Sequence, residues 1–467
     1  MSAVRGAAKG KENVYSSLCR FRAALCCSLL AVALAACGGG GRSGVVPNAG
    51  VVADSGLAAN DTTLVTAATA KSTSLTEMPR RAASFADSVG VNVHLGYYWT
   101  RYSDITAVQN LLTGLGIRHI RDGISPGWTN LCSEFSQLGA HGIRGDFIVG
   151  SWMSPTDVTT WDSCTGRTAD AYEGLNEWDI SHPATDTNWP QTDASVQQSL
   201  YSTVKAMRPV TVFAPSLTSE SAYAALGSVA ATSDVGNAHV YFAARNPGTT
   251  GWGAGDSFGV YGSLKYDLAI ARQTTGTKPI VVTETGYGDT SDTVYVPPAT
   301  KARYTLRTLL EAWNAKLSRT YLYELIDEGG GYFGSYGLAD GNGNVKPAYT
   351  AVKNLLAHLS DPGRAVTLRS LAYTLAAPAQ VHHALFEKRD GSFVLALWLE
   401  VSEWDPNANV PIAVAPQATV LTFGRVPSML RTTSFDDGGN VTTQALAQSG
   451  AVTLSVGGSP TLLDIMP

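Results

Sequence analysis

The chain has 467 residues, of which 44% are hydrophobic and 15% charged. These values exclude a disordered chain and a coiled coil, and the absence of any apolar run of eighteen or more after residue 40 excludes a polytopic membrane protein. Lys and Arg total 33 against 38 for Asp and Glu, and this net charge of −5 gives no electrostatic footprint for nucleic acid, which is therefore not an expected partner.

The amino terminus has the pattern of a secretion signal. Arg20 and Arg22 precede an apolar run from Ala23 to Ala36. At about fourteen residues this run has the length of a signal-peptide core and is too short to span a bilayer. It ends in Leu-Ala-Ala-Cys at 34–37. This ending resembles the bacterial lipobox, in which the cysteine is diacylated and becomes the first residue after cleavage.

The lipobox resemblance implies that residues 1–36 are a lipoprotein signal peptide and that Cys37 carries the lipid. Two acyl chains on one residue suffice for stable anchoring, so a membrane is an expected partner through this anchor only. Gly38 rather than Asp follows the cysteine, which in such lipoproteins favours the outer membrane of the bacterial cell envelope. An ordinary signal peptide is the alternative, and the mature protein would then be unanchored in the envelope.

The next segment changes in composition. From Gly38 to about Ser84 it is rich in Gly, Ala, Ser, Thr and Val, with no sustained period of 2 or 3.6. Such a segment is typical of a flexible linker. We therefore expect residues 37–84 to form a lipidated flexible tether.

Two cysteines remain in the expected mature fold. They are Cys132 and Cys164, because the others lie in the signal peptide or carry the lipid. A pair in an oxidising compartment favours one disulfide, which would close a loop of about thirty residues. No further ligands are spaced for zinc, so we expect neither a metal nor a cofactor.

Strands and helices alternate through the middle of the chain. Strand-like runs occur at 90–95, 117–121, 146–151, 169–175, 210–214, 238–242, 279–283 and 319–325, and helical spacing occurs at 105–115, 196–207, 264–271, 302–315 and 348–359. Eight β-then-α units match a (β/α)8 barrel better than an open doubly wound sheet, which has fewer strands and a glycine-rich phosphate loop that is missing here. We expect this α/β TIM barrel to occupy residues 85–360.

The pattern changes again after Asp361. Alternating strands follow, with turn signals at Arg-Asp-Gly 389–391 and Asp-Gly-Gly-Asn 437–440. These features predict a C-terminal antiparallel β-sandwich over residues 361–467.

A barrel places its chemistry at the carboxyl ends of its strands. Strand four ends in Glu-Gly-Leu-Asn-Glu-Trp at 173–178, and strand seven ends in Val-Val-Thr-Glu-Thr-Gly-Tyr at 281–287. Each strand delivers a glutamate, Glu177 and Glu284, to the same rim. Hydrolysing an acetal needs one protonated carboxyl for the leaving oxygen and one ionised carboxylate to attack the anomeric centre. The two positions therefore predict a catalytic pair.

Together with His-Val-Tyr 239–241 at the end of strand six, Asn176, Glu177 and Glu284 resemble clan A of the retaining glycoside hydrolases, which act mostly on β-glycosidic bonds. The resemblance covers about residues 90–359, and a C-terminal β-sandwich also occurs in several of these families, including family 39. It implies a carbohydrate substrate, with Glu177 as acid/base and Glu284 as nucleophile. A non-catalytic carbohydrate-binding protein and a transglycosylase are the alternatives, although binding alone does not require two facing carboxyl groups.

Supporting roles follow for residues at other strand ends. We expect Asn176 to bond the sugar 2-hydroxyl, Arg121 to keep Glu284 ionised and Tyr241 to donate to this nucleophile. Expected wall residues of the sugar subsites are His94, Trp152 and His239. Arg121 has a second interpretation, a salt bridge to Glu173.

Other positions also have competing interpretations. His239 could equally be a core imidazole, and four aromatic residues could either pack or support sugars: Tyr97, Tyr98, Trp99 and Trp178. Strand eight departs from the clan, because a tryptophan often ends it and the segment 321–328 here contains none.

Three further motifs predict no function. Gly-Asp-Ser-Phe-Gly at 255–259 fits a nucleophile elbow but follows no strand. Asp-Gly-Asn-Gly-Asn at 340–344 starts like a calcium loop but lacks its glycine and its final acid, and so predicts a hairpin turn. His382 and His383 are adjacent on a strand and would point to opposite faces.

Overall fold

The computed structural model describes residues 71–467, apart from Gly127, Thr129, Pro183 and the ranges 249–262, 291–293 and 330–333. The expected signal peptide, Cys37 and the motif at 255–259 lie outside the described residues. Within the described part, no helix has the length and hydrophobicity needed to cross a membrane.

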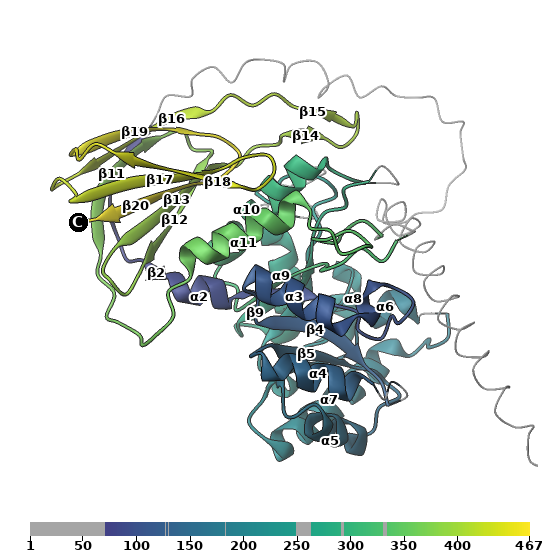
Figure 1. Ribbon diagram of the computed structural model, residues 1–467. Coiled ribbons are helices and arrows are strands. Elements are labelled where there is room, and N and C mark those ends of the chain that lie inside the picture. Colours follow the sequence, from purple (N-terminus) through teal and green to yellow (C-terminus); the bar gives the residue numbers. More distant parts are fainter. Residues whose placement is uncertain are drawn as a thin grey trace, which may run out of the picture. The chain divides into compact units, whose positions relative to one another are not determined.

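Eight parallel strands form one sheet in the order β7-β6-β5-β4-β3-β10-β9-β8 (Figure 1). A parallel bridge between Phe213 and Val235 joins its two ends, so the sheet closes on itself. The strands are β3 (Val89–Asn92), β4 (His119–Ile124), β5 (Arg144–Val149), β6 (Ala169–Glu173), β7 (Thr211–Phe213), β8 (Gly236–His239), β9 (Ile280–Thr285) and β10 (Thr320–Leu322). Each overlaps one predicted run, and the predicted (β/α)8 barrel is confirmed.

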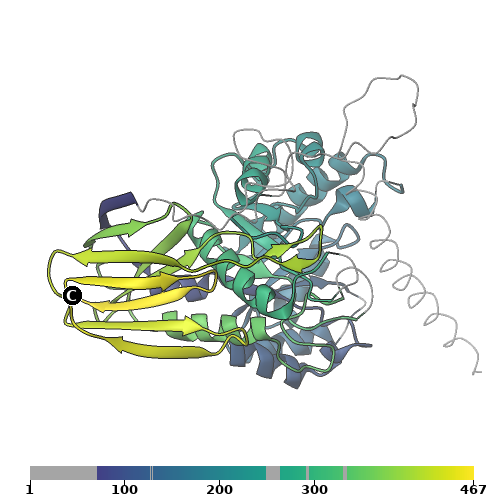
Figure 2. The same ribbon diagram turned by 90° about the horizontal axis from the view of Figure 1, so that it is seen from above.

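Helices follow the strands and cover the outside of the barrel (Figures 1 and 2). They are α3 (Ile105–Leu115), α4 (Leu131–Ala140), α5 (Pro155–Cys164), α7 (Trp189–Met207), α8 (Glu220–Leu226), α9 (Leu264–Thr275), α10 (Pro298–Asn314) and α11 (Pro347–Leu359), with the short α2 (Ala82–Asp87) and α6 (Trp178–Ser181). Helix α3 shows why a helix begins and ends where it does. Asp104 caps its first turn, and Gly116, at φ 78°, ends it. A disulfide joins Cys132 in α4 to Cys164 in α5.

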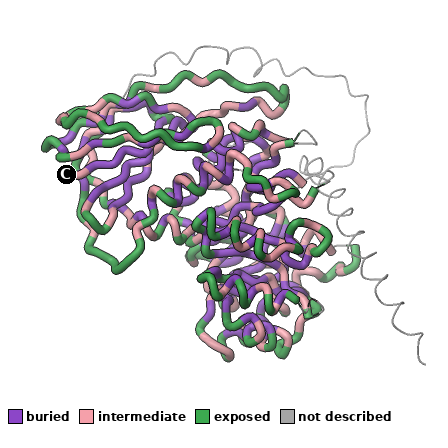
Figure 3. The backbone as a smooth tube through the Cα atoms, in the orientation of Figure 1, coloured by how far each residue is buried: buried purple, intermediate pink, exposed green. Residues whose placement is uncertain are grey.

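Two sheets form the sandwich, and all their strand pairs are antiparallel except the short parallel pair of β2 with β12. The predicted β-sandwich is confirmed. The strand orders of the two sheets are β1-β11-β16-β19 and β18-β17-β20-β13-β12-β2. The strands are β1 (Lys71–Glu77), β2 (Arg80–Arg81), β11 (Leu371–Ala377), β12 (Val381–Glu387), β13 (Phe393–Leu399), β16 (Gln417–Phe423), β17 (Met429–Phe435), β18 (Val441–Leu446), β19 (Ala451–Val456) and β20 (Thr461–Met466), beside the small hairpin β14 (Trp404–Asp405) and β15 (Val410–Pro411). Every residue of β13 is buried (Figure 3).

Two of these strands correct the expected extent of the tether. Residues 71–77 and 80–81 are not linker but β1 and β2, so a tether reaching to Ser84 was wrong. Strand β1 pairs with β11 along its whole length and packs Leu75 against the sandwich core. Its polar sequence, Lys-Ser-Thr-Ser-Leu-Thr-Glu, reflects an edge strand that is mostly exposed, and such a strand has no apolar alternation to reveal it.

Barrel and sandwich meet through buried side chains. Phe85 of α2 and Trp313 of α10 pack against Phe386 of β12 with ring centroids 5.4 and 5.8 Å away. Arg307 of α10 makes a bidentate ion pair with Glu400, which follows β13, with the shorter contact at 2.7 Å. The Arg307 side chain is 0% exposed and that of Glu400 is 1% exposed.

Candidate active site

Glu177 lies where the chain leaves the barrel mouth between β6 and α6. It occupies the N-cap of α6 with φ 47° and ψ 44°, a left-handed conformation that a residue with a side chain rarely adopts. Its backbone N–H donates to the carbonyl of Ser216, and its carbonyl accepts from the Ser181 hydroxyl. These bonds hold an unfavourable conformation, of the kind that clusters at functional sites.

Glu284 points into the mouth from β9. Its Oε1 accepts a hydrogen bond of 2.6 Å from Arg121, and its Oε2 accepts one of 2.8 Å from the Tyr241 hydroxyl. The strand end can approach β10 closely because residue 286 is glycine: a Cβ there would lie 2.2 Å from the carbonyl oxygen of Tyr323. The carboxylate is thus fixed on both oxygens and is 13% exposed.

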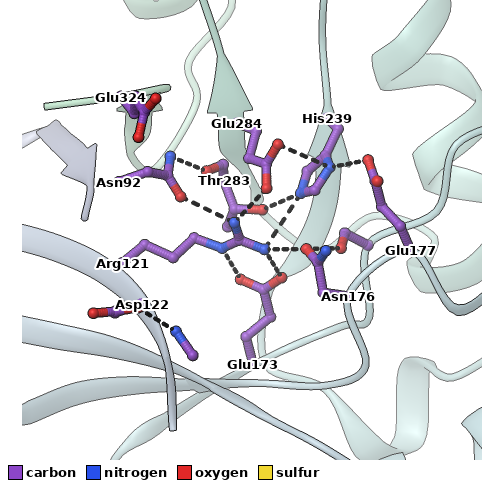
Figure 4. A network of polar contacts seen from close by, with 12 residues as sticks. Asn92, Arg121, Asp122, Glu173, Asn176, Glu177, His239, Thr283, Glu284 and Glu324 are labelled. Atoms are coloured by element: carbon purple, nitrogen blue, oxygen red, sulfur yellow. Dashed lines mark hydrogen bonds and ion pairs between the residues drawn. The ribbon is translucent and has the colours of Figure 1, made fainter. Parts of the chain in front are cut away.

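Arg121, from β4, is the buried hub of the site (Figure 4). Besides Glu284, it binds both oxygens of Glu173 at 2.8 and 2.7 Å. It also donates to Asn92 Oδ1 at 3.0 Å and to Asn176 Oδ1 at 2.6 Å. The two interpretations of Arg121 therefore do not compete, since one guanidinium makes the salt bridge to Glu173 and also contacts Glu284. Its five donors in a planar fork make this possible.

His239 lies between the two glutamates. Its Nδ1 is 2.7 Å from Glu177 Oε1 and 3.6 Å from Glu284 Oε2. Its Nε2 is 3.1 Å from the hydroxyl of Thr283, which itself donates to Asn237. One oxygen of each glutamate and one ring nitrogen all lie within 4.8 Å of one another. The imidazole thus bridges the pair, which neither sequence interpretation of His239 anticipated.

The charges around Glu284 set its protonation. Burial alone would raise the pKa of Glu284, but the charges of His239 and Arg121, with the hydrogen bonds from Tyr241 and Arg121, outweigh burial and lower it. Burial likewise opposes the charge on His239, but the charge of Glu284 and the hydrogen bond to Glu177 raise the pKa of the imidazole above its usual value. Glu284 is therefore held ionised.

Of the remaining expected site residues, Asn176 contacts Arg121, whereas His94 and Trp152 follow other strands. Asn176 accepts from Arg121 and from Ser216 through Oδ1, and among the described residues its amide nitrogen has no protein partner. His94, after β3, has Nε2 3.1 Å from Glu328 and 3.4 Å from Glu324. Trp152 is 54% exposed after β5, and no hydrogen bond or ring contact between described residues joins it to the glutamates.

Sequence reasoning missed three polar residues here. Asn92, at the end of β3, donates to the carbonyls of Thr283 and Leu322 and so ties three strands together. Glu324 and Glu328 follow β10, and Glu324 is fully buried. The signal for Glu324 was a charged residue within the apolar run of strand eight.

Two clusters in the described part of the chain bring an imidazole and two carboxylates within 4.8 Å and could hold a metal ion. One is Glu177, His239 and Glu284; the other is His94, Glu324 and Glu328. The motif at 340–344 is a turn in which Asp340 accepts from the backbone N–H groups of Asn342 and Asn344. His382 and His383 contact different partners, Glu311 and Glu77.

The sequence matches no protein-family model and no curated protein. Solved structures do match. A monomeric β-xylosidase from Caulobacter crescentus has a TM-score of 0.53 at 14% identity, covering 84% of this chain and 98% of that one. A family 39 glycoside hydrolase from the gut symbiont Bacteroides cellulosilyticus has a TM-score of 0.51 at 14% identity, covering 82% of each. The chain shares its fold with glycoside hydrolases of family 39.

A third solved structure also has a similar fold. The arabinose complex of an α-L-arabinofuranosidase from Thermotoga maritima has a TM-score of 0.52 at 11% identity and covers 77% of this chain and 89% of that one. Identities this low show a common fold, and the activity has to be argued from the site itself.

Proposed function

We propose that the protein is a retaining glycoside hydrolase that cleaves β-glycosidic bonds of an oligo- or polysaccharide, with Glu177 as acid/base and Glu284 as nucleophile. The observation that carries this proposal is the distance between them: their nearest carboxylate oxygens lie within 4.8 Å of each other. Retaining enzymes hold their two carboxyl groups about 5 to 5.5 Å apart, whereas inverting enzymes need about 6.5 to 9.5 Å for an intervening water.

The first step forms a covalent glycosyl-enzyme. Glu284 attacks the anomeric carbon while the bond to the leaving oxygen breaks, and that oxygen takes the proton of Glu177. Arg121 and Tyr241 favour this nucleophile because both keep the attacking carboxylate ionised and oriented. The side-chain amide nitrogen of Asn176, Nδ2, is the donor available for the sugar 2-hydroxyl.

The second step releases the sugar. Glu177, now a carboxylate, takes a proton from water, the water oxygen bonds to the anomeric carbon, and Glu284 leaves as a free carboxylate. His239 supports this alternation because its Nδ1 contacts Glu177 at 2.7 Å and fixes the side chain that must both give and take a proton.

A trapping experiment tests the nucleophile. The protein is incubated with activated 2-fluoro glycosides of xylose, arabinose and glucose, and is then examined by intact mass and peptide mapping. We expect a glycosyl adduct on Glu284, which would also identify the sugar. A label on another carboxylate would overturn the assignment of roles.

A substitution tests the acid. Glu177→Ala should slow substrates with poor leaving groups by at least about a hundredfold, and activated aryl glycosides far less in the first step, because only the former need the proton. Glu220→Ala, an exposed carboxylate on α8, is the matched control and should leave both rates unchanged. Equal losses for both classes of substrate would count against Glu177.

We further propose that the protein is a lipoprotein anchored through Cys37 in the bacterial cell envelope. The lipobox-like ending at 34–37 supports this, and so does the Cys132–Cys164 disulfide, which suits an oxidising compartment. Metabolic labelling with palmitate should label the wild-type chain, whereas Cys37→Ser should abolish the label and move the protein to the soluble fraction. Retained labelling in Cys37→Ser would contradict the proposal.

A further inference from the structure

Three rings stack outward from the active site toward solvent. The rings of His94 and Tyr97 are 4.9 Å apart with planes at 13°, and those of Tyr97 and Trp99 are 4.9 Å apart at 19°. Trp99, the outermost, is 68% exposed, more than any other large apolar side chain in the described part of the chain. A rigid, solvent-facing indole is a platform suited to the apolar face of a sugar ring.

Trp99 borders a hollow of about 550 Å³. This volume lies in the range of small-molecule sites. In addition to Trp99, the hollow is lined by polar residues that include Arg101, Ser103, Glu328 and Asn342. An exposed ring face beside several donors and acceptors is the combination that a sugar requires, since each sugar presents both C–H faces and hydroxyl groups.

A chain of side-chain contacts links the hollow to the catalytic pair. Glu328, which lines the hollow, is 3.1 Å from His94 Nε2. From His94 a wall of rings leads inward through Tyr323 at 5.5 Å, then Tyr336 at 6.2 Å, then Tyr241 at 5.9 Å. Tyr241 donates to Glu284. One aromatic wall therefore runs from the proposed nucleophile to Trp99.

The strand order gives the side on which the hollow lies. Its lining residues follow β3 and β10, whereas Glu177 follows β6. Strands β6 and β10 are four positions apart in a ring of eight, so they face each other across the mouth. Figure 4 shows Glu324, which follows β10, and Glu177 on opposite sides of Glu284. The leaving group lies on the side of Glu177, so the hollow extends from the sugar that Glu284 attacks.

We propose that Trp99 and this hollow form a second sugar subsite on the glycosyl side of the cleaved bond. The inference rests on the proposed function and adds to it that the substrate is a chain presenting at least two sugars on that side. The enzyme then releases products longer than a monosaccharide, since a site for terminal single sugars would be closed at this point.

Matched pairs of chromogenic substrates test the subsite. We compare kcat/KM for 4-nitrophenyl β-xyloside with β-xylobioside, and for β-glucoside with β-cellobioside, in the full chain. For the preferred sugar, we expect kcat/KM for the two-sugar substrate (the bioside) to exceed kcat/KM for the one-sugar substrate (the monoside) at least about tenfold. Trp99→Ala should remove most of that preference while changing the monoside rate less than about twofold, and Trp99→Phe should retain much of it.

Tyr98→Ala is the control, because Tyr98 is the neighbouring aromatic residue, is 38% exposed and is outside the lining of the hollow. It should keep the full preference for biosides. A wild-type preference for monosides, or an equal loss on both substrates in Trp99→Ala, would overturn the subsite while leaving the glycosidase assignment intact. Failure to cleave any of the four substrates would count against the proposed function on these sugars, and the subsite would fall with it.

Discussion

At the scale of single residues, one buried cation serves two carboxylates. Arg121 is 2% exposed and contacts both Glu173 and Glu284. A third carboxyl, Asp146, lies fully buried nearby, and burial together with the charge of Glu173 raises the pKa of Asp146 well above its usual value. The neutral form of Asp146 is therefore favoured, and this form adds no further negative charge beside Arg121.

The Tyr241 hydroxyl gives a testable pH dependence. It donates to Glu284 and so favours the ionised carboxylate, which helps to lower the pKa of Glu284. Tyr241→Phe removes the donor, so the pKa of Glu284 rises and the acid limb of kcat/KM moves to higher pH. We also expect kcat/KM at its optimum to fall about tenfold, as expected for one hydrogen bond to a charged group.

Tyr349→Phe controls for the loss of a hydroxyl. The Tyr349 hydroxyl donates to the carbonyl of Leu111, on the outside of the barrel. This variant should keep the wild-type pH profile. An acid limb that stays in place in Tyr241→Phe would show that the hydroxyl does not act on the nucleophile.

Part of this site could be predicted from sequence. Glu177 and Glu284 were expected because strand ends in a barrel share one rim, and period-two spacing placed Glu173 on the same inward face as Glu177. The bridging position of His239 could not be predicted, since it depends on how far β8 extends relative to its neighbours. The role of Trp99 depends on the path of a loop, for which spacing along the sequence carries no information.

At the scale of elements, β1 shows which kind of strand the sequence does not reveal. It covers the edge of β11 with seven paired residues and shields the apolar residues Leu371 and Leu375, which are 7% exposed. The barrel strands were predictable because short runs containing Val, Ile and aromatic residues alternate with stretches of helical spacing. Strand β1 was not, because an exposed edge strand carries Ser, Thr and Lys, as linkers do.

Truncation tests the importance of β1. A chain that begins at Met78 lacks the strand and should melt several degrees lower than one that begins at Lys71, because the sandwich core next to β11 becomes exposed. Differential scanning calorimetry measures the shift. The chain beginning at Lys71 should melt like the full-length protein, and equal melting temperatures of all three chains would mean that β1 contributes nothing to stability.

At the scale of the whole folded unit, Arg307 and Glu400 couple barrel to sandwich. Glu400 also accepts from Asn246 and from the N–H of Gly248, in the segment after β8. Burial opposes ionisation of Glu400, but the Arg307 charge outweighs burial and lowers the pKa of Glu400. The contribution of ionised Glu400 to the free energy of unfolding is therefore fully present above its pKa in the unfolded chain, about 4.3. It is lost as pH falls through the lower pKa of Glu400 in the folded protein.

Removing one partner of the Arg307–Glu400 ion pair should lower the stability of the fold. Arg307→Met leaves Glu400 buried without its cation, and we expect the free energy of unfolding to fall by about 3–5 kcal/mol. The double substitution Arg307→Met with Glu400→Leu should lose less, because no charge is then stranded. Guanidinium unfolding at pH 7 measures the free energy of unfolding of these two variants and of Glu400→Leu alone. A double variant as unstable as the sum of its single variants would indicate that the two residues act independently.

The position of β1 in the C-terminal sandwich has a consequence for synthesis. Ser74 faces Thr374, three hundred residues later. As the chain leaves the ribosome, this first strand stays without its neighbour until the entire barrel has been made. Pairings over such distances close late and slowly. The docking of β1 then comes late in folding, and until then its unpaired backbone groups must be kept from other exposed strand edges.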